Sequence, residues 1–213
     1  MHEAYEGDPW VGEDVDQRYA LLTELGDCHA AMSEDPAAQH CYREACRLAP
    51  EKTDAYVGLG ALAARKGLFD QAKRSFEIAR HLDPTCARAY GGLAMILHQQ
   101  KDYPAAFEMY LKCLELDTDD LMALLGLFQT SCQMGTFAQI IHYLEVYLSS
   151  HPDDASVLFC LATLLAREGD FDQAGRCLRR VLELEPGKVE AARLLAQVTD
   201  TMARARPKEA VPA

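Results

Sequence analysis

Apolar and polar residues along this chain recur with one period. Between residues 53 and 120 the same pattern is written twice, as TDAYVGLGALAARKGLFDQAKRSFEIARHLDPTC and then as ARAYGGLAMILHQQKDYPAAFEMYLKCLELDTDD. When the two copies are aligned, Tyr56 matches Tyr90, and Phe76 matches Tyr110. A repeat length of roughly 20–50 residues is typical of stacked-repeat architectures. The sequence therefore predicts a series of similar units rather than one central core.

Each copy of the pattern predicts two helices joined by a turn. Its first half places apolar residues at helical spacing, as in Tyr56, Leu59 and Ala63. Gly67 then marks a reversal of the chain, as Gly135 and Gly169 do in later copies. The second half is again helical and ends before a proline, which cannot continue a helix. We therefore predict an all-α fold.

The repeat frame continues without an insertion from Tyr19 to Lys188. The five predicted repeats are Tyr19–Lys52, Thr53–Cys86, Ala87–Asp120, Leu121–Asp154 and Ala155–Lys188. Residues 189–204 form one more amphipathic pattern, which we interpret as a capping helix with a polar outer side. Residues 205–213 show no periodicity and are predicted to be disordered. The paired acids Asp119–Asp120 and Asp153–Asp154 lie at repeat junctions and are interpreted as turn residues and helix caps.

Residues 1–18 precede the frame and are expected to form an acidic leader that contains the only tryptophan, Trp10. The pair Asp8-Pro9 is a candidate helix start, because aspartate caps helices and proline suits their first position. One interpretation is that the leader extends the first helix and covers the flank of repeat one. The other is that Trp10 anchors the leader in the chain's own groove or in that of a second molecule.

The recurring spacing of aromatic or Leu, Leu-Gly, Ala, aromatic, Ala and Pro resembles the tetratricopeptide repeat family. The resemblance covers residues 19–188 and implies a right-handed superhelical solenoid of helix-turn-helix repeats. It also implies a concave groove lined by the first helix of each repeat. Members of this family are mostly adaptors, co-chaperones and assembly factors that bind peptides or helices of other proteins. The resemblance thus implies a non-catalytic interaction module, and we expect a protein or peptide ligand.

Charge and composition exclude several other classes of protein. The net charge is −12, and the Lys and Arg residues are not gathered into a basic stripe, so nucleic acid is not an expected partner. The first residues lack a signal-peptide pattern, and no apolar run approaches the roughly 18 residues of a membrane span. We therefore expect a soluble cytoplasmic protein that does not bind membranes.

The cysteines and histidines do not form a recognisable active site. None of the eight cysteines belongs to a CxxC pair, and most occupy positions that suit a small apolar residue. The densest cluster consists of Cys28, His29, His40, Cys41 and Cys46. In the repeat frame these side chains point in different directions, whereas a catalytic or metal site requires convergence. We predict no catalytic residue, metal or cofactor and keep an enzyme with a Cys/His site as the last alternative.

The resemblance also implies which residues line the groove, by their positions in the first helix of each repeat. The predicted peptide-binding residues are Val57, Arg65, Arg88, Met95, Gln99, Met122, Leu125, Gln129, Phe159 and Arg167. Thr163 and Ala166 occupy further groove positions in repeat five. We expect the methionines, Leu125 and Phe159 to form an apolar floor and the polar side chains to form its rim.

Repeat four departs most from the pattern, because Phe128, Ile140 and Tyr147 replace small residues. Its first helix is apolar nearly all round, which predicts either an exposed ligand-binding patch or wider helix spacing with these residues in the core. Glycines inside first helices, such as Gly58 and Gly92, similarly indicate close approach of either a neighbouring helix or a ligand. Self-association through repeat four or the leader, which would give a homo-oligomeric scaffold, is the alternative function.

Overall fold

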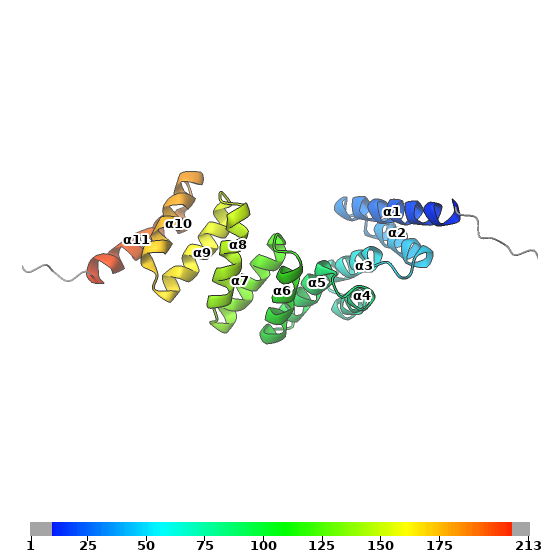
Figure 1. Cartoon of the computed structure of the whole chain (residues 1–213), viewed down its shortest axis with the longest axis horizontal. Helices are drawn as coiled ribbons and strands as arrows, with labels where there is room; N and C mark the ends of the chain where they lie inside the picture. Colours follow the sequence, from blue (N-terminus) through cyan, green and yellow to red (C-terminus); the bar gives the residue numbers. More distant parts are fainter. Residues whose placement is uncertain (1–9, 206–213) are drawn as a thin grey trace, which may run out of the picture. The chain divides into compact units, whose positions relative to one another are not determined.

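The computed structural model describes residues 10–205, and this part of the chain folds into eleven α-helices without a strand (Figure 1). The helices are α1 (Trp10–Ala31), α2 (Asp35–Leu48), α3 (Asp54–Arg65), α4 (Phe69–Leu82), α5 (Ala87–Gln99), α6 (Tyr103–Leu116), α7 (Leu121–Met134), α8 (Ala138–Ser150), α9 (Ala155–Glu168), α10 (Phe171–Leu184) and α11 (Val189–Ala205). They form five helical hairpins followed by one C-terminal helix, so the all-α fold class is confirmed. None of these helices combines the length and apolar character needed to cross a lipid bilayer.

The chain divides into two compact units, which we call unit 1 (Met1–Leu116) and unit 2 (Asp117–Ala213). Unit 1 contains the hairpins α1/α2, α3/α4 and α5/α6, and unit 2 contains α7/α8, α9/α10 and α11. In unit 1 the first helices of successive hairpins contact one another, α1 with α3 and α3 with α5. In unit 2, α9 contacts α11 in the same manner. We call these surfaces the first-helix face of unit 1 (α1, α3, α5) and the first-helix face of unit 2 (α7, α9, α11).

Small residues lie where the two helices of a hairpin approach each other. Ala38, Ala72 and Ala106 occupy equivalent places in α2, α4 and α6, and all three are fully buried. An alanine carries no atoms beyond Cβ, so the facing helix can approach closely at these points. The rings of Tyr42 and Phe76, four residues further along α2 and α4, fill the adjacent space and are almost completely buried. The core of unit 1 is thus an alternation of small and large side chains.

Every hairpin reverses direction at the same position of the frame. Gly67, Gly135 and Gly169 adopt φ angles of 73°, 73° and 89° there. Ser33 and Lys101 hold the equivalent places in the first and third hairpins, with φ angles of 60° and 64°. These values lie in the left-handed region, which glycine adopts without the penalty that a Cβ imposes. The predicted reversals at the three glycines are confirmed, and the same turn forms at Ser33 and Lys101 without glycine.

Aspartates at the repeat junctions start two helices of unit 2. Asp120 Oδ1 accepts a hydrogen bond from Ala123 N at 2.9 Å. Asp154 Oδ1 accepts bonds from Ser156 N and Val157 N, both at 3.0 Å. These bonds satisfy amides of the first helical turn that have no partner within the helix. The predicted capping role is confirmed for Asp120 and Asp154.

The fourth hairpin, α7/α8, is packed more sparsely than the other four. Phe128 and Ile140 stand at its contact point, where the second hairpin has Gly60 and Ala72. Ile140 is fully buried, so its bulk holds α7 and α8 apart. This observation favours the wider helix spacing expected for repeat four. Met122 at the start of α7 is nevertheless 76% exposed and does not enter the core.

Helix α1 begins before the predicted first repeat. Residues 10–18 continue the first helix of repeat one toward its N-terminus, and Lys52 Nζ donates to Asp16 Oδ1 at 2.7 Å. For residues 10–18 this favours the interpretation that the leader extends the first helix. The remainder of the leader, with the Asp8-Pro9 helix start, lies outside the described residues, as does the predicted disordered tail after Ala205. The repeat boundaries themselves stay a prediction.

Candidate functional site

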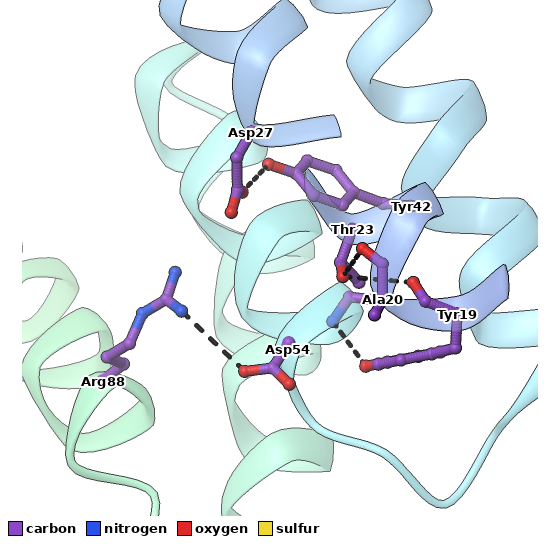
Figure 2. A network of polar contacts seen from close by, with 8 residues as sticks. Tyr19, Ala20, Thr23, Asp27, Tyr42, Asp54 and Arg88 are labelled. Carbon is purple, nitrogen blue, oxygen red and sulfur yellow. Dashed lines mark hydrogen bonds and ion pairs between the residues drawn. The ribbon is translucent and has the colours of Figure 1, made fainter. Parts of the chain in front are cut away.

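A polar network joins the helices of the first-helix face of unit 1 (Figure 2). The hydroxyl of Tyr42 in α2 donates to Asp27 Oδ1 in α1 at 2.5 Å. Arg88 of α5 lies 3.9 Å from the carboxylate of Asp54 in α3. The hydroxyl of Tyr19 in α1 accepts a bond of 3.1 Å from the backbone N–H that follows Asp54. These contacts bring together two acids, one base and two phenols.

Tyr42 reaches this surface between two glycines. A Cβ added at Gly26 or at Gly58 would lie only 2.5 Å from Cε1 of the Tyr42 ring. A Cβ added at Gly92 in α5 would likewise collide with the ring of Phe76 in α4. Because the rings occupy this space, Gly58 and Gly92 accommodate a neighbouring side chain. This favours the packing interpretation of these glycines over close approach of a ligand.

The structure separates the residues predicted to bind peptide in unit 1 into buried, paired and open side chains. Val57 is only 3% exposed and belongs to the core of the second and third hairpins. Arg65 donates to the backbone oxygen of Ala30 at 2.8 Å and forms an ion pair with Asp35. The three open residues are Arg88, Met95 and Gln99, of which Arg88 also lies within ion-pair distance of Asp54. We therefore leave Val57 out of the proposed binding surface.

The predicted residues of unit 2 are largely accessible. Met122 and Gln129 are exposed on α7, and Leu125 is half-buried between them. Phe159 of α9 is half-buried, with Lys188 Nζ 5.4 Å from the centre of its ring. The exposed Arg167 lies with its guanidinium carbon 5.6 Å from the centre of the Phe137 ring.

A cavity of about 360 Å³ opens on the first-helix face of unit 2. Its lining comes from α9, from the start of α10 and from α11. The lining residues are Thr163, Ala166, Arg167, Phe171, Leu194, Gln197, Val198 and Thr201. The apolar members form its body, and the hydroxyls, the amide and the guanidinium supply polar groups. The cavity therefore combines apolar surface with a few polar groups, as ligand sites in proteins commonly do.

Sequence reasoning found one side of this cavity and missed the other. Thr163, Ala166 and Arg167 were predicted from their repeat positions, whereas α11 was predicted only to cover the last repeat. The frame itself contained the missing signal. If it is continued past residue 188, Leu194, Gln197 and Thr201 fall at first-helix positions equivalent to groove positions of the earlier repeats. Helix α11 therefore acts as a further first helix as well as a cover.

The cysteines and histidines of the first repeat differ in burial and in their contacts. Cys28 is exposed and Cys41 is buried, and none of the eight cysteines, all of which lie within residues 10–205, forms a disulfide. His29 Nδ1 lies 2.6 Å from Glu34 Oε2 on the surface. Within residues 10–205 no three His, Cys, Asp or Glu side chains are grouped so that they could hold a metal ion.

Two further cysteines, Cys132 in α7 and Cys160 in α9, lie in unit 2. Burial raises the pKa of Cys160 to about 11, and burial also raises the pKa of Cys132. At neutral pH both thiols therefore stay protonated, whereas the thiolate is the nucleophilic form. These cysteines thus contribute apolar bulk rather than reactivity.

Family models described as tetratricopeptide repeat match two segments of the chain, residues 62–120 and residues 132–198. The first segment lies within repeats two and three, and the second runs from repeat four into α11. Together they cover more than half of the chain.

Individual relatives agree with these matches. Anaphase-promoting complex subunit 3 of Schizosaccharomyces pombe is 26% identical over 139 residues, which represent 65% of this chain and 21% of that protein. The solved structure of Pseudomonas aeruginosa pilF is 20% identical, with a TM-score of 0.75, and the match covers 89% of this chain and 86% of pilF. YrrB, described as a TPR protein with an unusual peptide-binding site, is 17% identical, with a TM-score of 0.63 and coverage of 81% and 89%. At these identities the two structures establish a shared fold.

Proposed function

Because the chain belongs to the tetratricopeptide repeat family, we propose that it is a non-catalytic module that binds an apolar peptide or an amphipathic helix of a partner protein. In this proposal the protein serves as an adaptor, chaperone or assembly factor. The principal binding surface is the first-helix face of unit 2, centred on the cavity between α9 and α11. The chain spans about a fifth of the length of the curated relative described above, so that relative's partners are not carried over.

The cavity is the single observation that most supports this proposal. Its volume of about 360 Å³ lies in the range of about 300–1,000 Å³ that is usual for ligand pockets. Three of its lining residues, Thr163, Ala166 and Arg167, occupy positions at which the family binds peptides. The solved structure of YrrB is described as having a peptide-binding site, which supports a peptide as the class of ligand.

The chemistry of the cavity indicates what the ligand would carry. Ala166, Phe171 and Leu194 offer apolar surface that an aliphatic or aromatic side chain would cover. Arg167 and Gln197 at the same cavity can donate hydrogen bonds to a carboxylate or a backbone carbonyl. The expected ligand is therefore a segment with an apolar anchor beside an acidic or carbonyl group.

The ligand would extend from the cavity along the same face of unit 2. Phe159 precedes Thr163 by one helical turn on α9 and continues the apolar surface. On α7, Met122, Leu125 and Gln129 supply an apolar and polar stripe for a longer segment. In unit 1 the open residues Arg88, Met95 and Gln99, with the paired Arg65, form a second proposed contact surface.

The substitution Ala166→Trp tests this function, because an indole at this half-buried position would fill the cavity. Ala196→Trp is the matched control, since Ala196 is exposed on α11 and does not line the cavity. Each variant is immobilised and used to capture proteins from the cell of origin, with quantitative mass spectrometry as the readout. We expect Ala166→Trp to lose the partner at least about tenfold, which corresponds to about 1.4 kcal/mol.

A synthetic peptide from the captured partner then measures the affinity by calorimetry for wild type and both variants. Thermal unfolding monitored by circular dichroism establishes that the variants are folded. The proposal is wrong if a folded Ala166→Trp protein captures the same proteins in the same amounts as Ala196→Trp.

A further inference from the structure

The outer side of α1 carries apolar residues at positions that are buried in the following hairpins. In the second hairpin, Ala55 and Leu62 occupy repeat positions 3 and 10, and they are 0% and 4% exposed against the first hairpin. In α1 the same two positions hold Leu21, which is 57% exposed, and Cys28, which is also exposed. These residues face away from α2 and α3, the helices on which α1 packs.

Two more apolar residues extend this surface along the helix. Leu25 is 42% exposed, and Met32, the first residue after α1, is 59% exposed. Both lie at helical spacing from Leu21 and Cys28. We call Leu21, Leu25, Cys28 and Met32 the α1 stripe. A contiguous exposed apolar stripe on a helix marks a contact surface in many soluble proteins.

The size of Leu21 shows that the stripe is not built for a preceding hairpin of the same kind. Repeats that have a hairpin before them carry a side chain smaller than leucine at position 3, namely Ala55, Ala89, Ala123 and Val157, and all four are buried. Small side chains there let the preceding helices approach closely. A leucine at this position would hold such a hairpin away, so the stripe fits a different neighbour.

We propose that the α1 stripe binds the α1 stripe of a second copy of this chain, with the two helices antiparallel about a two-fold axis. The spacing of the stripe is the same in both directions, because its successive members are four, three and four residues apart. An antiparallel pair therefore places Leu21 opposite Met32 of the other copy and Leu25 opposite Cys28. Such self-complementarity is what a two-fold interface requires.

Charges at the two ends of the stripe complement each other in this arrangement. Arg18 precedes Leu21 by as many residues as Asp35 follows Met32, so an antiparallel pair brings each Arg18 near the partner's Glu34. Asp35 itself is already held by Arg65 and Lys66 of its own chain. The side chains of Arg18 and Glu34 are 64% and 53% exposed. The leader before Trp10 is a poorer occupant, because it contains Glu3, Glu6 and Asp8 but no Lys or Arg that could pair with Glu34. The charge pattern thus favours a second copy over the leader.

The mass of the full chain in solution, measured by light scattering and sedimentation equilibrium over a range of concentrations, tests the proposal. We expect a concentration-dependent dimer whose dissociation constant rises at least about tenfold in Leu25→Glu, because the variant buries a charge in the interface. Ile78→Glu is the matched control, since Ile78 is 43% exposed on α4 of the same unit and lies outside the stripe. A monomer at all concentrations would overturn the proposal, as would a dimer that Leu25→Glu does not weaken.

Cross-linking tests the antiparallel register independently. In a Cys28→Ser background, Leu21→Cys combined with Met32→Cys should form an intermolecular disulfide on mild oxidation. Either substitution alone should not, because each cysteine then faces a leucine or a methionine. The seven other native cysteines are present in every variant and serve as an internal background. Equal cross-linking of Leu21→Cys alone would show a parallel pair and would overturn the arrangement.

Discussion

At the scale of single residues, the contact between hairpins depends on a glycine, because its lack of a side chain leaves room for a neighbouring ring. We predict that Gly58→Ala lowers the free energy of unfolding by about 1–3 kcal/mol, because its Cβ would lie 2.5 Å from Cε1 and Cζ of the Tyr42 ring. A decrease in stability would be informative, since alanine is otherwise favoured over glycine inside a helix by about 1 kcal/mol. Urea unfolding followed by circular dichroism measures the change.

Two comparisons establish that the Tyr42 ring is the cause. Gly187→Ala adds a methyl group where no atom lies within 4 Å, and its stability should change by no more than about 0.5 kcal/mol. In a Tyr42→Ala background the cost of Gly58→Ala should shrink, because the contacted ring is gone. An undiminished cost in that background would mean that the glycine is needed for another reason.

The hydroxyl of Tyr42 gives a second prediction at this scale. Burial, followed by the hydrogen bond to Asp27, raises the pKa of Tyr42 above its ordinary value of 10.0. The folded state therefore holds the proton more tightly than the unfolded state. The stabilisation this provides is fully present below pH 10 and is lost as the pH rises toward the folded pKa.

We predict that Tyr42→Phe removes part of this alkaline loss of stability. At pH 7 the variant should be less stable by about 1 kcal/mol, because the bond to Asp27 is missing. Between pH 9 and 11, roughly the range around a tyrosine pKa of about 10, its stability should fall less steeply than that of wild type. Urea unfolding at several pH values tests this, with Tyr90→Phe as the control, since Tyr90 donates to the backbone oxygen of Pro84. Identical slopes for wild type and Tyr42→Phe would contradict the prediction.

Individual positions also show where sequence reasoning ends. The buried alanines and the turn glycine Gly67 could be predicted, because the local period alone assigns them. Val57 and Arg65 could not be sorted in this way, because a repeat position gives only the direction of a side chain from its helix. Val57 is covered by the next hairpin. Arg65 is held by Asp35, thirty residues earlier, and no local pattern encodes that pairing.

At the scale of helices, the start of α9 depends on one carboxylate. Asp154 accepts bonds from two amides of the first turn, so we predict that Asp154→Ala lowers the free energy of unfolding by about 1 kcal/mol. Its neighbour Asp153 is a matched control, because it pairs with the exposed Arg180 on the surface. Asp153→Ala should cost no more than about 0.5 kcal/mol. Chemical unfolding of the two variants side by side measures the difference, and equal costs would argue against the cap.

Helices were predictable as elements, whereas their extent and neighbours were not. The frame assigned two helices to each repeat, and the hairpins follow it. The period did not extend α1 back to Trp10, because residues 10–18 lie outside it, and only the interpretation of the leader as an extension of the first helix anticipated this. The period also did not show that α11 completes a cavity, since that depends on how Leu194 and Gln197 stand against α9. A pattern along one helix describes its faces but does not name what lies opposite them.

At the scale of the whole molecule, the regular repeat frame does not reveal that the chain divides into two compact units. The period runs through residue 116 without an insertion, yet the chain separates there into two compact units. The only sequence signal nearby is the bulk of Phe128 and Ile140 in repeat four, which weakens the fourth hairpin. In repeat proteins, contacts between neighbouring repeats supply much of the stability. A sparsely packed hairpin therefore weakens the dependence of one repeat's stability on the next.

This division predicts that a defect in one unit stays in that unit. Val198 of α11 is 2% exposed, so Val198→Ala should lower the stability of unit 2 by about 1–3 kcal/mol. Amide hydrogen exchange in α7–α11 should then accelerate on the order of tenfold, whereas exchange in α1–α6 should not change. Val189→Ala is the matched control, because Val189 is 64% exposed on the same helix and should leave both units unaffected. Equal acceleration in α1–α6 would contradict the prediction. It would show that the two units unfold as one cooperative block, because the stability lost through Val198→Ala would then be lost equally in both.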